Sequence, residues 1–312
     1  MYYRKILVTG CAGDIAISVA RILRDENVCE CLYGCDISDD HPGKFFFDKC
    51  FVLPRADDKT YFSCLSNLVG NEGVELIIPC SEAELRLLAE NEFFGKANWF
   101  LTANLFSMRV GFDKYLTNKI LENKILPRPW TCLANENLPL EYPCILKSKY
   151  GCGSKRIVKI NNVEEINNVS IYEDDIFQEF LPDEEEEYTC GVFRGTDKVV
   201  RTIILKRKLR GGLTGSGIVV HNMKIDGLLE TLADLIDLNG SINVQLRMKN
   251  GLPMIFEINP RFSSTVGFRN KLGFKDLLWS IQNKKGIELD NFEKPVEGIK
   301  FYKVYEDIII YS

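Results

Sequence analysis

Histidine is scarce in this sequence: His41 and His221 are the only two among 312 residues. This scarcity excludes a His-rich metal site and argues against a Ser-His-Asp catalytic triad. Long apolar runs are also lacking, since no stretch approaches the roughly 18–20 residues that a bilayer span needs. The opening MYYRKILVTG contains no small-residue cleavage site of a signal peptide. We therefore expect a cytoplasmic protein with no membrane partner.

Positive charge is in the minority. The formal net charge is −5, which argues against a nucleic-acid partner bound through a basic surface. The cysteine count, 11, is odd and comes without a secretory signal, so reduced thiols are expected. The glycine-lysine pattern of a standard P-loop is missing as well.

The chain changes character near residue 105. Up to that point strand-like runs alternate with helical stretches, as in an open parallel α/β sheet. The strand-like runs are 4–9, 29–36, 74–81 and 97–103. Beyond residue 105, strands and helices follow one another without strict alternation, which indicates an α+β domain. We therefore predict two domains, 1–105 and 106–312, in agreement with the length of the chain.

The first turn of the chain allows a dehydrogenase interpretation. VTGCAGDIA places Gly10 and Gly13 after the first predicted strand, and Asp36 ends the second, where a ribose-binding acid would lie. Tyr115 and Lys119 form a Tyr-x-x-x-Lys pair, but about one such pair is expected by chance in this composition. An NAD-dependent epimerase or reductase is the alternative that this turn leaves open.

The stretch PMIFEINPRF, 253–262, runs from apolar residues into polar ones. Because side chains alternate along a strand, Glu257, Asn259 and Arg261 point to one face. Carboxylate and amide oxygens are ligands suited to Mg²⁺, which needs few protein ligands when phosphates supply the rest. The pattern predicts a metal site here, with a surface ion pair between Glu257 and Arg261 as the alternative.

The preceding strand can add Gln245 to this face. If KNGLP, 249–253, is a five-residue loop, Gln245 lies opposite Glu257. A two-residue Asn-Gly turn would instead place Phe256 opposite Gln245 and break the site. We expect the longer loop.

A second cluster of residues lies in ILKSKYGCGSKRI. Lys147 follows apolar residues on a predicted strand, so its ammonium is held by a firm backbone. Gly151 and Gly153 form a loop that can approach phosphate oxygens closely, with backbone N–H groups and Ser154 as donors. An ordinary glycine-rich hairpin is the alternative interpretation.

These stretches together resemble a known family. The order Asp113-Lys114, LKSKYGCGS, QEFLPDEEEEYT, NVQLRM and FEINPRF is similar to that of the ATP-grasp superfamily. It looks most like single ATP-binding halves of the carbamoyl phosphate synthase large chain. The resemblance covers about residues 105–285. It implies a pre-ATP-grasp, Rossmann-like domain over 1–105, then a two-lobed ATP-grasp domain with a small lobe over 106–181 and a large lobe over 182–312.

The resemblance implies a nucleotide site. Lys114 and Lys147 would contact the phosphates of ATP, and the loop of Gly151, Gly153 and Ser154 would close over them. Glu179 would meet the adenine amino group beside the backbone of Phe180 and Leu181, and Glu187 would bind the ribose.

The resemblance also implies metal and catalytic residues. Gln245, Glu257 and Asn259 would hold one or two Mg²⁺, for which Mn²⁺ can substitute. Arg261 would face the acyl phosphate or its carboxylate precursor, and Arg210 is assigned to the same phosphate- or substrate-facing role.

The function implied is that of an ATP- and Mg²⁺-dependent ligase. It would activate a small-molecule carboxylate as an acyl phosphate and transfer the acyl group to an amine. One alternative is phosphorylation of carbamate or bicarbonate, as in carbamoyl phosphate synthase, although this chain resembles only one half of that enzyme. Another is a nucleotide-binding scaffold without activity. A homodimer is compatible with the sequence.

Overall fold

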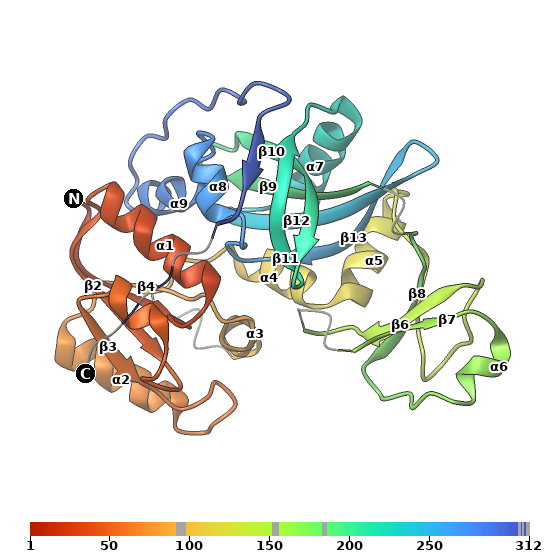
Figure 1. Ribbon diagram of the computed structural model, residues 1–312, viewed down its shortest axis with the longest axis horizontal. Coiled ribbons are helices and arrows are strands. Elements are labelled where there is room, and N and C mark those ends of the chain that lie inside the picture. The colour runs from red at the N-terminus through yellow and green to blue at the C-terminus, as the bar shows by residue number, and fades with distance from the viewer. Residues whose placement is uncertain (92–97, 152–155, 183–185, 305–306, 308, 310–312) are drawn as a thin grey trace.

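The computed structural model describes residues 1–91, 98–151, 156–182, 186–304, 307 and 309. Its strands form three sheets, which follow one another along the chain. Figure 1 shows the N-terminal sheet on the left, the large sheet in the upper centre and the small third sheet on the right. The α/β and α+β parts expected from the sequence are both present.

The N-terminal sheet is parallel, with strand order β3-β2-β1-β4. Its strands are β1 (Tyr3–Thr9), β2 (Cys29–Asp36), β3 (Lys49–Val52) and β4 (Leu76–Ile78). The predicted strand over 97–103 is reduced, in its described part, to a single bridge between Ile77 and Phe100. Apolar side chains such as Ile6, Leu7 and Ile78 are fully buried because helices cover both faces of the sheet.

Four helical segments connect these strands. They are α1 (Asp14–Asp25), the 3₁₀ helix η1 (Pro42–Phe46), α2 (Tyr61–Glu72) and α3 (Glu82–Glu90). Residues Val19, Ala20 and Leu23 of α1 recur at helical spacing and are buried against the sheet. Among the described residues, no helix is long and apolar enough to cross a membrane.

The large sheet is antiparallel and has the order β13-β12-β9-β10-β11-β14. Its strands are β9 (Glu187–Arg194), β10 (Val200–Arg210), β11 (Leu213–Val219), β12 (Gly240–Lys249), β13 (Leu252–Asn259) and β14 (Lys300–Tyr302). Residues 195–199 form the connection between the antiparallel strands β9 and β10.

Helices cover the two faces of the large sheet unequally. One face packs on α4 (Leu105–Phe112), α5 (Lys114–Asn123) and α7 (Met223–Leu235), which supply the largest apolar cluster. The other face carries α8 (Val266–Lys271) and α9 (Asp276–Lys284), whose apolar contacts centre on Phe193, Phe274 and Trp279. The strand positions of this second face beyond that cluster hold polar and charged residues, and these form the candidate site.

The third sheet is also antiparallel, with order β5-β8-β6-β7. It consists of β5 (Thr131–Leu133), β6 (Cys144–Ser148), β7 (Ile157–Ile160) and β8 (Asp175–Glu179), with the short α6 (Val163–Ile166) at its edge. Its own small apolar cluster includes Leu146 and Phe177. The sheet therefore forms a separate lobe, and β6 carries Lys147 towards β13.

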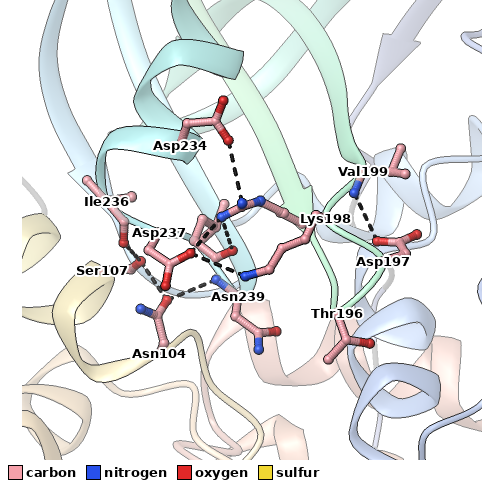
Figure 2. A network of polar contacts seen from close by, with 12 residues as sticks. Asn104, Ser107, Thr196, Asp197, Lys198, Val199, Asp234, Ile236, Asp237 and Asn239 are labelled. Carbon is pink, nitrogen blue, oxygen red and sulfur yellow. Dashed lines mark hydrogen bonds and ion pairs between the residues drawn. The ribbon is translucent and has the colours of Figure 1, made fainter.

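Asn104 links the N-terminal part to the large sheet. Its backbone N–H donates to the Asn239 carbonyl at 2.9 Å, and its side-chain Oδ1 accepts from the Asn239 N–H at 2.9 Å and from the Ser107 hydroxyl at 2.6 Å. Figure 2 shows this group beside the ion pairs of Asp237 with the β9–β10 connection. The chain thus enters the second half through a fixed junction near the boundary that the sequence predicted.

Candidate active site

The β12–β13 hairpin brings Gln245 opposite Glu257, as predicted, but by a different route. The predicted five-residue loop is wrong, because Lys249 pairs with Leu252 and the turn is the two residues Asn250 and Gly251. Both turn residues have positive φ, 52° and 73°, as a tight hairpin turn requires. Such a turn alone would pair Gln245 with Phe256.

A β-bulge at Phe256 corrects the register. Leu246 pairs with Ile255 and Gln245 pairs with Glu257, which leaves Phe256 as the extra residue. The burial pattern reflects the bulge, since Phe256 and Glu257 are both only partly buried while Ile255 and Ile258 are buried. Two successive side chains of β13 are therefore partly exposed.

Lys114 and Glu257 form the centre of the site. The Lys114 Nζ lies 3.1 Å from the Glu257 Oε1, with side chains 8% and 18% exposed. The same ammonium donates to the Gly151 carbonyl at 2.7 Å, so it also contacts the glycine-bearing segment. Asp113 caps α5, because its Oδ1 accepts from the N–H groups of residues 115 and 116 at 2.9 and 3.0 Å. This cap fixes the helix start at Lys114.

Lys147 reaches the same centre from the small lobe. The pKa of Lys147 is lowered to about 8, chiefly by burial and then by the positive charge of Lys114, while Glu257 acts in the opposite sense. Its Nζ lies 5.9 Å from the centre of the Phe256 ring. Burial also raises the pKa of Glu257, but the charges of Lys114 and Lys147 outweigh it and hold that pKa below its ordinary value. The buried Lys114 and the partly buried Lys147 thus both act on the charge of one carboxylate, which Lys114 contacts directly.

Asn259 and Arg261 extend this centre towards the N-terminal domain. The Arg261 Nη2 donates to the Asn259 Oδ1 at 3.2 Å and lies 3.4 Å from a carboxylate oxygen of Glu82, at the start of α3. Asn259 is 5% exposed, and its Nδ2 is buried with no hydrogen-bond partner among the residues that the structure describes. The predicted face of Glu257, Asn259 and Arg261 is therefore formed, and Arg261 connects it to α3.

Glu187 is held between two arginines. Its Oε1 accepts from the Arg207 Nε at 2.9 Å, and its Oε2 accepts from the Arg247 Nη2 at 2.7 Å. The three residues lie side by side across β10, β9 and β12. Arg247 also donates to the Leu181 carbonyl at 2.6 Å. Each carboxylate oxygen accepts two N–H groups, Oε1 from Arg207 and Oε2 from Arg247, so a ribose hydroxyl would have to share or displace one of these contacts.

The connection between the lobes is formed by the end of β8. Glu179 pairs with Lys249, and its Oε2 accepts from the Trp130 N–H at 3.2 Å. The ring of Phe180 lies beneath the Lys159 ammonium, 4.1 Å from the ring centre to Nζ. Glu179 is thus engaged within the protein, whereas the sequence suggested only a nucleotide contact.

The remaining predicted residues have different outcomes. Gly151 is described, with φ 90°, a backbone conformation that favours glycine. Gly153 and Ser154 lie outside the described residues. Arg210 is exposed at the tip of the β10–β11 hairpin, several residues along β10 from Leu205, the position in line with Gln245. The structure therefore does not bring Arg210 into the row of Gln245 and Glu257.

Sequence reasoning missed four charged residues at this site. They are Glu82, Arg207, Arg247 and Lys249. A signal existed for Arg247, which follows Gln245 by two residues and therefore shares its face of β12. Glu82 carried no such signal, because its contact with Arg261 joins segments that are far apart in the sequence.

The glycine turn after β1 is already occupied by protein contacts. The Cys11 N–H donates to the Cys35 carbonyl at 3.1 Å, the Ala12 N–H donates to Asp36 at 2.8 Å, and the Gly13 N–H donates to the Gly10 carbonyl at 3.0 Å. These are the amides that a dinucleotide pyrophosphate would need. The geometry therefore gives the dehydrogenase alternative no support.

Comparison with protein families identifies this arrangement. Residues 112–265 match the model of the ATP-grasp domain. This part of the chain is therefore an ATP-grasp domain, and the predicted superfamily, fold and enzyme class are confirmed. The match includes the segments that carry Lys114, Lys147, Glu187 and Glu257. A comparison with curated proteins finds no match.

Solved structures share the fold over nearly the whole chain. A Rhizobium etli pyruvate carboxylase has a TM-score of 0.72 at 15% identity over 92% of this chain and 29% of that chain. The biotin carboxylase domain of the Hydrogenobacter thermophilus 2-oxoglutarate carboxylase, solved as a dimer with MgADP, ADP and bicarbonate, has a TM-score of 0.74 at 17% identity, covering 96% and 73%. An L-amino acid ligase from Bacillus licheniformis has a TM-score of 0.69 at 15% identity, covering 94% and 75%.

Proposed function

We propose that this protein is an ATP- and Mg²⁺-dependent ligase that activates a small-molecule carboxylate as an acyl phosphate and transfers it to an amine. The observation that carries the proposal is the group of the buried Lys114 and the partly buried Lys147 and Glu257 within the ATP-grasp domain. Two cations around one carboxylate leave an excess of positive charge. That excess suits the phosphates of a nucleotide.

The two lysines are assigned to the phosphate groups of ATP. Phosphoryl transfer depends on positioning and charge neutralisation more than on covalent help from the protein. Lys114 already contacts the Gly151 carbonyl, so it links the nucleotide site to the segment proposed to cover the phosphates. The ammonium of Lys147 is partly desolvated before any ligand binds, which strengthens its attraction for a phosphate oxygen.

Glu257, Asn259 and Gln245 fit the role of Mg²⁺ ligands. The fit rests on the donor set, one carboxylate and two side-chain amides from adjacent strands, and on the Lys114 ammonium that already lies against Glu257. The buried, unpartnered Asn259 amide nitrogen indicates a side chain held for a purpose other than its own hydrogen bonds. When bound, the metal would neutralise phosphate charge.

The other residues of the site bind and orient the substrates. Glu187 is assigned to the ribose, and Arg207 and Arg247 keep its carboxylate in place. Glu179, Phe180 and Leu181 are assigned to the adenine edge. Arg261 is assigned to the carboxylate substrate, since it lies between Asn259 and Glu82 at the boundary with the N-terminal domain. The substrate carboxylate attacks the γ-phosphorus of ATP, which forms the acyl phosphate and releases ADP. An amine then attacks the acyl carbon and displaces phosphate, which gives the amide.

A second candidate is phosphorylation of bicarbonate or carbamate. It is supported by the similar fold of the 2-oxoglutarate carboxylase domain, which was solved with bicarbonate and MgADP. That dimer is also compatible with a homodimer here. The two candidates share the nucleotide site and differ only in the acid. The cytoplasmic location remains a prediction, as does the domain division near residue 105.

Measuring ADP release with a panel of acids and amines tests the proposal. ADP release should require both MgATP and an acid, and amide product should require the amine. Bicarbonate-dependent ADP release without an amine would favour the second candidate. Glu257→Gln should lower turnover by at least about a hundredfold, as loss of one charged group at a phosphoryl-transfer centre does. Unchanged turnover in this variant would refute the assigned site.

A further inference from the structure

The N-terminal sheet has a cavity at the carboxyl ends of its strands. The strand order β3-β2-β1-β4 reverses direction between β1 and β4, and in open α/β sheets ligands bind at such a point. The cavity there has a volume of about 240 Å³. Its walls include Thr9 at the end of β1, Asp36 at the end of β2, Ser81 after β4 and Glu84 of α3. It is separate from the row of Gln245 and Glu257.

Glu84 is a buried acid that faces this cavity without a positive partner. It is 2% exposed, and its two oxygens accept from the hydroxyl groups of Thr9 and Tyr61. The pKa of Glu84 is raised to about 7, chiefly by burial; the hydrogen bonds from the two hydroxyls act to lower it, and the negative charge of Asp36 adds to the rise. No cation contributes among the described residues. Burying a carboxylate that has no positive partner lowers the free energy of unfolding, and a bound cation would offset this cost.

The only guanidinium in the cavity wall does not supply that charge. The Arg55 Nε lies 3.1 Å from an oxygen of Asp57, and both side chains are mostly exposed, at 70% and 72%. The pair is neutral and lies at the solvent side. Asp36, in turn, accepts only backbone N–H groups, from Ala12 and Ile37 at 2.8 Å each, in its described contacts. The interior wall is therefore negative and rich in hydrogen-bond acceptors.

Two common ligand classes do not suit this cavity. A phosphate is disfavoured because the glycine-turn amides donate within the protein and because the carboxylates of Asp36 and Glu84 stand in the wall. An inorganic metal ion is disfavoured because the described residues include no group of three or more His, Cys, Asp or Glu arranged to hold one. What suits the wall is a compact organic cation with hydrogen-bond donors.

We propose that this cavity binds a small organic ammonium compound whose charged group lies between the carboxylates of Asp36 and Glu84. An ammonium has three donors and no acceptor, and each carboxylate oxygen still has a free lone pair for it. Leu53 and Pro54 of the same wall can pack on the carbon stem of the ligand. The site is distinct from the nucleotide site and does not depend on the ligase proposal. Glu82 and Glu84 lie on the same first turn of α3, so the cavity adjoins the helix that contacts Arg261.

Calorimetric titration of the whole chain with n-butylammonium tests this inference, with n-butanol as the neutral probe of the same length. We expect a Kd of about 1–10 mM for an ammonium ligand of this size. Butanol should bind at least about tenfold more weakly. Asp36→Asn and Glu84→Gln should each weaken butylammonium binding by about tenfold or more. Glu75→Gln is the matched control, because Glu75 pairs with Arg4 at the amino ends of the strands, away from the cavity. This variant should bind butylammonium like the wild type.

Three results would overturn the inference: equal binding of butanol and butylammonium, undiminished binding in both cavity variants, or no heat of binding in the wild type over this concentration range. The shift of the melting temperature with MgATP serves as an independent reading. It should be retained in Asp36→Asn and Glu84→Gln, which shows that the variants are folded. Failure of the ligase proposal would leave the butylammonium result unchanged, so the two can be told apart.

Discussion

Gln245 lies directly opposite Glu257, although the turn between their strands contains only Asn250 and Gly251. The bulge at Phe256 makes the two facts compatible, because it adds one residue to β13 between the turn and the site. Its side chain lies between two cations, with the ring centre 5.9 Å from the Lys147 Nζ and 6.0 Å from the Arg247 guanidinium carbon. The extra residue therefore also places an aromatic ring between Lys147 and Arg247.

Deleting Phe256 should leave the hairpin folded. The strand would become regular. Glu257 would then follow Ile255 directly, and it would still pair with Gln245. We expect a loss of about 1–2 kcal/mol, from the two cation–π contacts and reduced burial. Deleting Ile255, which is 1% exposed, should cost about 2–5 kcal/mol because a core side chain is lost. Urea unfolding measures both. If both deletions lowered the free energy of unfolding equally, the proposal that Phe256 can be removed without changing the strand register would be contradicted.

Replacing Lys147 with methionine should stabilise the free protein. The lowered pKa means that the ammonium is disfavoured in the folded state, and its loss should raise stability at pH 7 by about 1–3 kcal/mol. A chain of this size should then melt about 2–4 °C higher per kcal/mol. The rise in melting temperature that MgATP causes should disappear in Lys147→Met. The control is Lys149→Met, which removes a partly exposed ion pair with Asp174 and should keep this rise. A destabilised Lys147→Met variant that retains the shift would contradict the assigned role.

Glu187→Gln should affect both stability and nucleotide affinity. The change leaves Arg207 and Arg247 without their carboxylate, so unfolding free energy should fall by about 3–5 kcal/mol. If Glu187 also binds the ribose, the Kd for ATP should rise by about tenfold. The control is Glu186→Gln on the same segment, whose pair with Lys206 is half exposed and should contribute less than about 1 kcal/mol. An unchanged ATP Kd in folded Glu187→Gln would exclude the ribose contact.

The parts of the site that the sequence could predict are local. Alternation along a strand fixes the common face of Glu257, Asn259 and Arg261, and the Asp113 cap fixes the start of α5. The Asn250-Gly251 turn also has a clear local signal, which supports a two-residue turn. The bulge that compensates for this turn has no such signal. Its position depends on packing of Ile255 on one side of the sheet and Phe256 on the other.

The parts that could not be predicted depend on contacts between distant segments. Arg261 with Glu82, and Glu179 with Lys249, join residues from different sheets or lobes. Strand β3 was missed because it is only four residues long and none of them is fully buried. The cavity beside Glu84 depends on the strand order as well as on residue type. One sequence read alone does not supply that order.

The stability of the protein should depend on pH through Glu84. Its pKa is about 7 in the folded protein, compared with an ordinary value of 4.5, so the folded state holds this proton more tightly than the unfolded state does. The resulting stabilisation is fully present below about pH 4.5 and is lost as pH rises through about 7, a difference of about 3 kcal/mol. Glu84→Gln cannot titrate. Its stability relative to the wild type, measured by urea unfolding, should therefore rise by about this amount between pH 4.5 and 8. Comparing the two proteins cancels the opposite contributions of Glu257 and Asp48, whose pKa values are lowered. A difference that stays constant across this range would show that Glu84 titrates normally.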